Sequence, residues 1–374
     1  MQNKYFDNGA TSFPKPVAVA DRMYQYLTEV GGTYGRSAYG RVIESTRVIE
    51  TVRDKLSEKL GVGNPEHLVF TSNATSALNT IIFGLQLHDC HILISPLEHN
   101  SVVRPVDALR ISRNIAYDIL PHGPDGKVDT DRIAGALRKN TRLVIVNHQS
   151  NINGCIQPVH QIKQHIGDIP ILLDLAQSLG HEHIDLDSWQ IDFAAFTGHK
   201  GLLGPTGTGG FYIRKPDVVS PLFFGGTGSR SESFDMPLFL PDKFEAGTPN
   251  VAGLFGLLGA LENPQSPCFS REQFLAHLTK IESLRFLKCH RALDPHDQGP
   301  LYSLVHRNFD CSRFANCLYS EYQIETRSGL HCAPLGHKTL GTFPQGAVRI
   351  SLSPFHTEDD LNYLYESLKT MEKL

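Results

Sequence analysis

The sequence predicts an α/β protein with a large, mostly parallel sheet covered by helices and a smaller α+β C-terminal domain. Short apolar runs of strand length alternate with helical segments over the first two thirds of the chain, which is typical of a doubly covered parallel sheet. After Ala252 this alternation gives way to a looser pattern of strands and helices. The chain has 374 residues, too many for one small core, so a second domain is expected.

The alternation begins with an amphipathic helix at 47–61. Ile49, Val52, Leu56 and Leu60 fall on one face of this helix, and Gly61 is expected to end it. Six strands are then expected, at 67–72, 91–96, 142–148, 170–176, 192–198 and 209–214. Helices are expected between them at 75–85, 99–112 and 158–166.

The C-terminal third is expected to start with a helix over 252–262, followed by a loose segment. Strands are expected at 301–306, 324–329 and 346–353, with helices near 311–321 and from Thr357 onward. This order of elements is typical of an α+β domain that packs on a larger one.

Composition excludes several classes of function. The formal net charge is −4, without the basic excess that would suggest nucleic acid or an anionic membrane as a partner. The longest apolar stretch, near 252–261, is shorter than the roughly 18 residues of a membrane span, and the N-terminus lacks a signal-peptide pattern. The seven cysteines show neither CxxC nor Cys/His ligand spacing, so we expect no metal site and no disulfide framework. We therefore expect a cytoplasmic protein with reduced thiols.

Polar clusters directly follow several predicted strands, where open α/β sheets bind ligands. The stretch SNAT (72–75) joins a strand to a helix, so its free N–H groups and Thr75 suit an anion, although Thr75 could also serve only as an N-cap. Asp174 ends an apolar strand. A buried carboxylate there needs a partner such as a protonated ring nitrogen, but an aspartate that caps a loop explains the pattern equally well.

A lysine and two histidines complete this set. Lys200 ends a predicted buried strand in Gly-rich backbone, and a desolvated lysine has a lowered pKa and can form a Schiff base. Thr197 and His199 flank it and suit an anion, whereas His99 in LEHNS is, as a lone histidine, more often a satisfied core or surface residue. One ligand has a phosphate, a basic ring nitrogen and an aldehyde for these groups: pyridoxal phosphate (PLP).

On these motifs the sequence resembles the class V, fold-type I PLP-dependent enzymes, and among them the cysteine desulfurases and selenocysteine lyases, closest to group II (SUF-type) desulfurases. The matching segments are YFDNGATS (5–12), SNAT, LEHNS (97–101), SNINGCIQP (150–158), the whole of 174–210, FEAGTPN (244–250), RSGLHCAPL (327–335) and GAVRISLSPFHT (346–357). The resemblance implies an N-terminal segment 1–15 that contributes to the substrate loop, a large PLP-binding domain 16–250, and a small domain 251–374 that carries the cysteine loop.

The resemblance also implies roles for individual residues. The implied cofactor-binding residues are Ala74, Thr75, His99, Asn151, Asp174, Gln177, Thr197, His199, Lys200 and Thr248. Lys200 would form the Schiff base, Asp174 would pair with the ring nitrogen and Gln177 with the ring O3′, and His99 would stack on the ring and relay a proton. The implied substrate-binding residues are Ala10, Thr11, Asn151, Arg327 and Arg349.

The implied assembly is a homodimer in which Thr248 reaches the neighbouring subunit's cofactor. Arg36 and Tyr39 are expected to border the same shared entrance.

The implied reaction converts L-cysteine to L-alanine and passes the sulfur to Cys332 as a persulfide, for a sulfur-acceptor protein or thiol. Arg327 and His331 lie near Cys332 in the sequence, where positive charge would lower the pKa of its thiol. One alternative is cleavage of L-selenocysteine, or another class V lyase or aminotransferase reaction. Another is a PLP-binding scaffold that delivers sulfur only with a partner.

Overall fold

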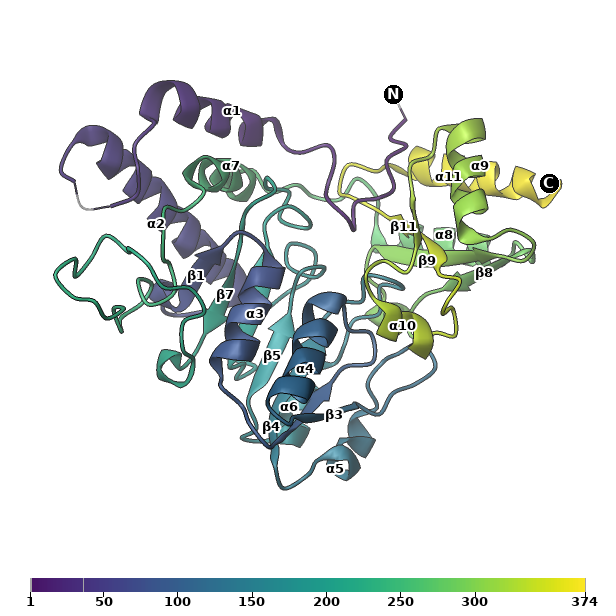
Figure 1. Ribbon diagram of the computed structural model, residues 1–374. Helices are drawn as coiled ribbons and strands as arrows, with labels where there is room; N and C mark the ends of the chain where they lie inside the picture. Colours follow the sequence, from purple (N-terminus) through teal and green to yellow (C-terminus); the bar gives the residue numbers. More distant parts are fainter. Residues whose placement is uncertain (1, 36, 374) are drawn as a thin grey trace.

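A seven-stranded sheet forms the centre of the computed structural model, which describes residues 2–35 and 37–373 (Figure 1). Its strands are β1 (Leu68–Thr71), β2 (His91–Ile94), β3 (Ala116–Ile119), β4 (Thr141–Asn147), β5 (Ile171–Asp174), β6 (Phe193–Thr197) and β7 (Gly209–Ile213). Their order is β1-β7-β6-β5-β4-β2-β3, and only β7 runs antiparallel to its neighbours. The predicted mostly parallel sheet is confirmed, and all six predicted strands end within two residues of the observed ones.

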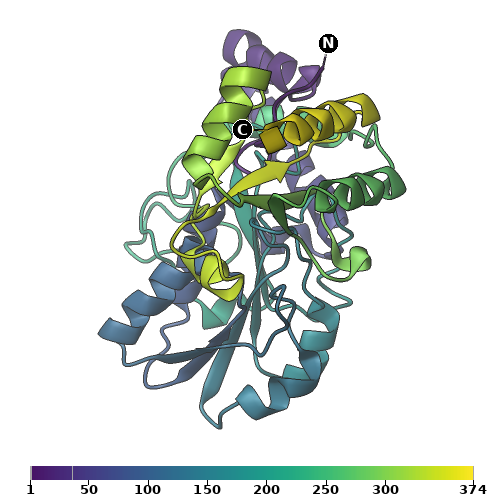
Figure 2. The same ribbon diagram turned by 90° about the vertical axis from the view of Figure 1, so that its right-hand side faces the viewer.

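Helices cover both faces of this sheet, as Figure 2 shows. They are α1 (Val17–Gln25), α2 (Gly40–Leu60), α3 (Ala74–Gly84), α4 (Asn100–Ser112), α5 (Ile133–Ala136), α6 (Val159–Ile166) and α7 (Val251–Glu262). Alternate residues of the strands point to opposite faces, so Leu173 packs in the cluster beneath α2, α6 and α7, and Leu172 in the cluster beneath α3 and α4. Gly61 ends α2 in the left-handed conformation, as the sequence predicts.

Helix α7 packs into the core of the large sheet. Leu254, Phe255 and Leu258 belong to the same apolar cluster as the buried face of α2. The predicted domain boundary between residues 250 and 251 assigns α7 to the small domain, whereas α7 packs in the core of the large sheet.

The small domain is built on a second, antiparallel sheet in the order β10-β11-β9-β8. Its elements are α8 (Arg271–Glu282), β8 (Leu287–His290), β9 (Leu301–His306), α9 (Cys311–Tyr322), β10 (Arg327–Gly329), α10 (Pro334–Thr339), β11 (Ala347–Ser351) and α11 (Glu358–Thr370). The loose segment expected after residue 262 is a loop over 263–270, and α8 and β8, for which the sequence predicts no element, follow it. Helix α8 begins at a capping box in which Ser270 and Gln273 bond reciprocally.

The N-terminal segment connects the two domains. Phe6 is buried in the small-domain core, and Asp7 forms a bridge with Ser351 of β11. A few residues later the backbone N–H of Ser12 donates to the carbonyl of His199, at a distance of 3.0 Å. The segment thus runs from the small domain to the end of β6, and its part in a substrate loop stays a prediction. Across the described residues we find no helix that combines the length and the apolar character needed to cross a membrane.

Candidate active site

A cavity opens at the carboxyl ends of the central strands, where the predicted polar clusters meet. It is lined by Asn73, Ala74, Thr75, His99, Ser101, Asn147, Asn151, Asp174, Ala176, Gln177, Thr197, His199 and Lys200. The fold thus brings together nine of the ten predicted cofactor-binding residues, all except Thr248. Asn73, Ser101, Asn147 and Ala176 were not predicted, although each lies within two residues of a predicted residue or at the end of a predicted strand.

Helix α3 points its N-terminus at this cavity. Asn73 is the N-cap, because its Oδ1 accepts a hydrogen bond from the Ser76 N–H at 2.9 Å. Thr75 is therefore not the cap, and its exposed hydroxyl lines the cavity. The first amides of a helix have no partner within the helix, so Ala74 and Thr75 present N–H groups suited to a phosphate.

Asp174 ends β5 as a buried carboxylate, 4% exposed. Its Oδ1 accepts from the Ala176 N–H at 2.9 Å, so it does cap a turn, as the alternative interpretation held. Burial raises the pKa of this carboxyl, and the Lys200 charge opposes the shift. Among the described residues no cation lies within ion-pair distance, so a protonated ring nitrogen would supply the missing partner.

Lys200 follows β6 and is half-buried. Burial lowers the pKa of its ammonium to about 8, while the Asp174 carboxylate opposes the shift. A larger fraction of the amine is therefore neutral and nucleophilic at physiological pH than for an exposed lysine. The N-terminal segment holds His199, the residue before Lys200. The His199 carbonyl accepts a hydrogen bond from the Ser12 N–H at 3.0 Å and another from Thr11 Oγ1 at 3.2 Å.

Thr197 lines the cavity beside Lys200, but its hydroxyl donates to the Thr208 carbonyl at 3.2 Å. It must turn to donate to a phosphate, whereas His199 keeps a buried Nδ1 without a partner. Burial lowers the pKa of His199 to about 4, so its ring is neutral at physiological pH.

His99 is the N-cap of α4, and its hydrogen bonds fix its tautomer. Its Nδ1 accepts from the Ser101 backbone N–H at 3.1 Å, so a neutral ring carries its proton on Nε2. Burial, followed by the charges of Lys200 and Arg327, lowers the pKa of His99 to about 4. The ring is thus neutral and lies in the cavity wall. Its proton is on Nε2, because Nδ1 accepts the N-cap hydrogen bond.

These residues fit PLP. Asn151 Oδ1, His199 Nδ1 and Arg349 Nε are buried without hydrogen-bond partners, and buried polar atoms rarely remain so. The helix end suits the phosphate, Asp174 the ring nitrogen and Lys200 the aldehyde. Gln177 lines the same cavity, although its Nε2 donates to the Gly9 carbonyl at 2.9 Å and leaves its Oε1 for a ligand.

The predicted substrate residues meet at the junction of the two domains. Arg349 is buried, and its Nη2 contacts Asp7 Oδ1 at 2.6 Å while its Nη1 contacts the Asn151 carbonyl at 3.2 Å. Gly9 lies against it, since a Cβ at that position would be 2.9 Å from the Arg349 Cζ. The sequence did not predict Asp7 or Gly9 as parts of the site. Ala10 and Thr11 continue this wall, and both are partly exposed.

Cys332 is exposed in the short loop 330–333 between β10 and α10. It lines a second cavity together with Thr75, His99 and Arg104, so this cavity adjoins the first through shared residues. The expectation that His331 supplies positive charge is wrong, because burial lowers its pKa to about 3 and leaves it neutral at physiological pH. Arg327 is exposed and remains a charged neighbour.

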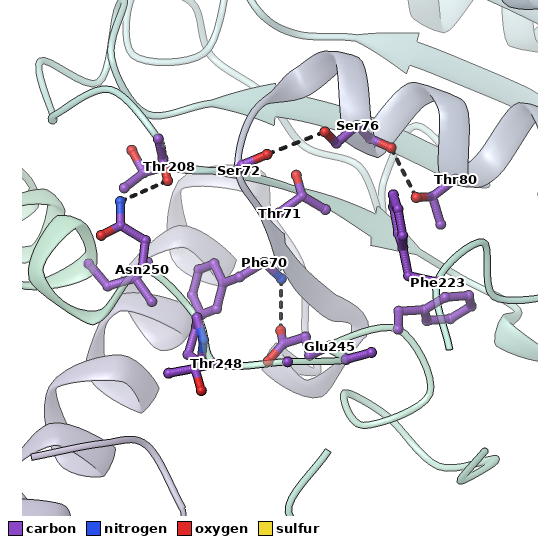
Figure 3. A pocket seen from close by; sticks show the side chains of 16 residues that line it. Phe70, Thr71, Ser72, Ser76, Thr80, Thr208, Phe223, Glu245, Thr248 and Asn250 are labelled. Carbon is purple, nitrogen blue, oxygen red and sulfur yellow. Dashed lines mark hydrogen bonds between the residues drawn. The ribbon is translucent and has the colours of Figure 1, made fainter. Parts of the chain in front are cut away.

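Thr248 lies in a different cavity, of about 420 Å³, shown in Figure 3. Phe70, Glu245 and Asn250 also line it, and the Phe70 N–H donates to Glu245 at 2.7 Å. Within one chain, therefore, Thr248 is not part of the Lys200 cavity. Tyr39 is exposed, and the predicted entrance residue Arg36 lies outside the described residues.

Comparisons with known proteins point to one family. The family model for aminotransferase class-V matches residues 4–364. A probable cysteine desulfurase from Methanothermobacter thermautotrophicus is 34% identical, over 99% of this chain and 95% of the relative. Among solved structures, the apo cysteine desulfurase from Thermococcus onnurineus NA1 has a TM-score of 0.90 and 26% identity, with 99% of this chain and 94% of that chain covered. A cysteine desulfurase from Escherichia coli, in an S-sulfonic acid form, has a TM-score of 0.87 and 27% identity, with 99% and 95% covered.

Proposed function

The chain belongs to the class V aminotransferase family, and from that premise we propose that it is a PLP-dependent cysteine desulfurase. It converts L-cysteine to L-alanine. The observation that carries this function is the single cavity in which Lys200, Asp174, His99 and the N-terminus of α3 converge, with Cys332 in the adjoining cavity. The assignment to the SUF-type subgroup stays a prediction.

Different residues of the cavity would bind different parts of the cofactor. Lys200 would bind its aldehyde covalently, Asp174 its ring nitrogen, and Ala74, Thr75 and His199 its phosphate. Bound PLP supplies an electron sink for negative charge that develops at the substrate Cα. Because Asp174 is buried, its charge would act in a low dielectric and would keep a proton on the ring nitrogen of bound cofactor.

The residues around the substrate orient it and receive its sulfur. Arg349 would bind the carboxylate of L-cysteine, and Lys200, once free, would move the Cα proton. Nε2 of His99 already carries a proton, so His99 would pass that proton on as it takes up the thiol proton there. The Cys332 thiolate would then bond to the substrate sulfur while the Cβ–S bond breaks. The electron pair of that bond stays with the carbon fragment, which takes up a proton and leaves as alanine.

A second copy of this chain is the proposed partner in assembly. The segment after β7 carries exposed apolar side chains, namely Leu222, Phe223, Phe224, Phe234, Leu238 and Phe239. So many exposed apolar side chains in one segment are typical of a surface that a partner covers. Thr248 follows this segment and is itself exposed, which supports a role in the neighbouring subunit's site.

We also propose that a sulfur-acceptor protein or thiol removes the sulfur from Cys332, and that the enzyme works in the cytoplasm. All seven cysteines are free thiols in the structure, which supports a reducing compartment.

The decisive experiment supplies L-cysteine or L-selenocysteine and measures alanine together with the mass of the Cys332 peptide. We expect stoichiometric alanine and a persulfide on Cys332 from L-cysteine. Cys332→Ala should lose the persulfide and keep the cofactor absorbance, and it should retain more activity on selenocysteine because the C–Se bond is weaker. Full alanine turnover from L-cysteine by Cys332→Ala would favour a simple lyase. Exposed Cys268→Ala is the matched control and should behave as wild type.

A further inference from the structure

A buried chain of hydrogen bonds lies beneath the cysteine loop and links His331, His337 and Thr342. His331 Nδ1 lies 3.2 Å from His337 Nε2, and His337 Nδ1 lies 2.7 Å from Thr342 Oγ1. The two imidazole rings stack with centroids 5.3 Å apart. None of these side chains lines the cofactor cavity, so the chemistry proposed above does not use them.

The direction of every hydrogen bond in this chain is fixed by its first member. His331 Nε2 lies 3.0 Å from the Arg327 carbonyl, which can only accept, so Nε2 carries the His331 proton. His331 Nδ1 must then accept, and His337 Nε2 must donate to it. His337 Nδ1 in turn accepts from the Thr342 hydroxyl. Burial lowers the pKa of both rings, to about 3 for His331 and about 4 for His337, so each is neutral and has one donor and one acceptor.

The chain ends at a strained piece of backbone. His331 and Cys332 both have left-handed backbone, with φ of 49° and 55°. Two consecutive non-glycine residues in this region are unfavourable and persist only where surrounding contacts hold them. The His331 carbonyl accepts from Asn151 Nδ2 at 2.8 Å, and the Cys332 carbonyl accepts from the Asn100 N–H at 2.7 Å.

These contacts tie the loop to three parts of the site. Arg327 lies in the substrate wall, Asn151 lines the cofactor cavity, and Asn100 follows His99. His337 belongs to α10, which lies between the small-domain sheet and the large domain in Figure 1. The helix is itself anchored to the large domain, because Thr339 Oγ1 donates to the Pro96 carbonyl at 2.8 Å.

We propose that His337 is a positioning residue, which acts through His331 to hold Cys332 in the backbone conformation that presents its thiol to the substrate sulfur. This role deepens the proposed function and rests on it. Loss of the Nε2 donor of His337 leaves His331 Nδ1 buried and unpaired, so the left-handed turn keeps its two carbonyl contacts but loses the one that orients the His331 ring. The thiol is then misplaced while the cofactor cavity is unchanged.

A matched pair of variants isolates the donor. In His337→Gln the amide nitrogen occupies the position of Nε2 and can still donate to His331, whereas in His337→Asn the shorter side chain reaches only the position of Nδ1. We expect single-turnover persulfide formation to be roughly 10- to 100-fold slower in His337→Asn, the scale expected for a misplaced reacting group, with KM and cofactor absorbance unchanged. His337→Gln should recover to within about 3-fold of wild type. Amide hydrogen exchange in the peptide 329–334 should be faster in His337→Asn only.

Two controls separate positioning from a general loss of stability. His277→Ala removes another buried histidine of the small domain, which bonds Tyr302 at 2.8 Å and not the cysteine loop, and it should leave persulfide formation unchanged. If His337→Asn does not fold, Thr342→Val removes, at nearly constant shape, the hydroxyl that keeps the His337 proton on Nε2. It should therefore also slow persulfide formation, with Thr342→Ser as its control.

The outcomes distinguish this inference from the proposed function. Should wild type form no persulfide, the desulfurase assignment fails, and hydrogen exchange alone then decides whether His337 holds the loop. Equal persulfide rates in His337→Asn and His337→Gln would overturn the positioning role, as would equal exchange in the two variants.

Discussion

Arg327 and Arg349 lie directly opposite each other in the antiparallel pairing of β10 with β11. Residues opposite each other in such a pair project to the same face of the sheet, so two guanidinium groups face the junction of the domains. Arg349 is buried and paired with Asp7, whereas Arg327 is exposed. Burial lowers the pKa of Arg349, and Arg327 lowers it further. Two cations and one carboxylate leave a net positive charge, which a substrate carboxylate would neutralise.

Arg349→Lys should therefore raise KM for L-cysteine by about 10- to 100-fold. The guanidinium fork of arginine can bond Asp7 and a substrate carboxylate at the same time, whereas the single ammonium of lysine cannot. Steady-state kinetics measure this, with Arg307→Lys as a surface control. An unchanged KM together with a lower melting temperature would mean that Arg349 serves only its ion pair with Asp7.

Borohydride reduction of the holoenzyme should attach the cofactor to Lys200 and to no other lysine. Peptide mass spectrometry locates the adduct, and Lys200→Ala should lose it. The matched control is Lys15→Ala. Lys15 lies 3.4 Å from the His199 carbonyl, and burial lowers its pKa also to about 8, so it is the neighbour with the most similar amine. An adduct on Lys15 in wild type would disprove the role of Lys200.

The sequence predicts the main residues of the site better than it predicts the side chains that contact them. Asp174 and Lys200 were predictable because each is a polar residue at the end of an apolar strand, and parallel strands end at the same edge of a sheet. Asp7 could not be assigned to Arg349, because the two are 342 residues apart and no periodicity relates them. The charge of His331 is likewise set by contacts that the sequence does not show. Its position beside Cys332 suggested a cation, but the fold buries its ring.

The same contrast holds for the fold. Strands buried on both faces were found because they are continuous apolar runs. Strand β3 was missed because it is an exposed edge strand, paired only with β2, and carries little apolar signal. Helix α8 was missed although Phe274, Leu278 and Ile281 have helical spacing and are buried. Helix α2 begins at Gly40, seven residues before its predicted start. Its first turns carry a single buried apolar side chain, Val42, beside the exposed Ile43, so their apolar pattern is weak.

Glu98 should make the protein less stable as pH rises. It is 0% exposed, its Oε1 accepts from Ser95 Oγ and the Asn147 N–H, and its Oε2 has no partner. Burial raises its pKa from 4.5 to about 8, so the folded state holds a proton that the unfolded state releases. The stabilisation is complete below pH 4.5 and is lost as pH rises to about 8.

Glu98→Gln should remove this dependence. Between pH 5 and pH 8, the difference in unfolding free energy between wild type and variant should fall by up to about 1.4 kcal/mol per pH unit. Denaturant unfolding at several pH values measures it, with exposed Glu58→Gln as the control. Parallel pH profiles for wild type and Glu98→Gln would show that Glu98 is ionised in the folded protein.

Thr248 should complete the cofactor site of the neighbouring subunit. In a single chain it is exposed and lines the cavity of Figure 3 rather than that of Lys200. A two-fold axis would make the exchange reciprocal, so that both sites are completed together. Thr248→Ala should therefore weaken PLP binding, and dilution to monomer should release the cofactor. Thr80→Ala, which alters a hydroxyl in the same cavity and beyond the first turn of α3, should bind PLP as wild type does.

Hybrid dimers decide whether Thr248 acts on its own subunit or on its partner. Each hybrid combines one Lys200→Ala subunit with one Thr248→Ala subunit. If Thr248 acts across the interface, the Lys200→Ala subunit donates a normal Thr248 to the only normal Lys200, so each hybrid has one intact site and one with both defects. If it acts within its own subunit, each site has one defect and none is intact. At limiting PLP, half of wild-type activity per hybrid dimer supports the shared site. Activity no higher than the mean of the two parent variants contradicts it, as does a fully active monomer in sedimentation.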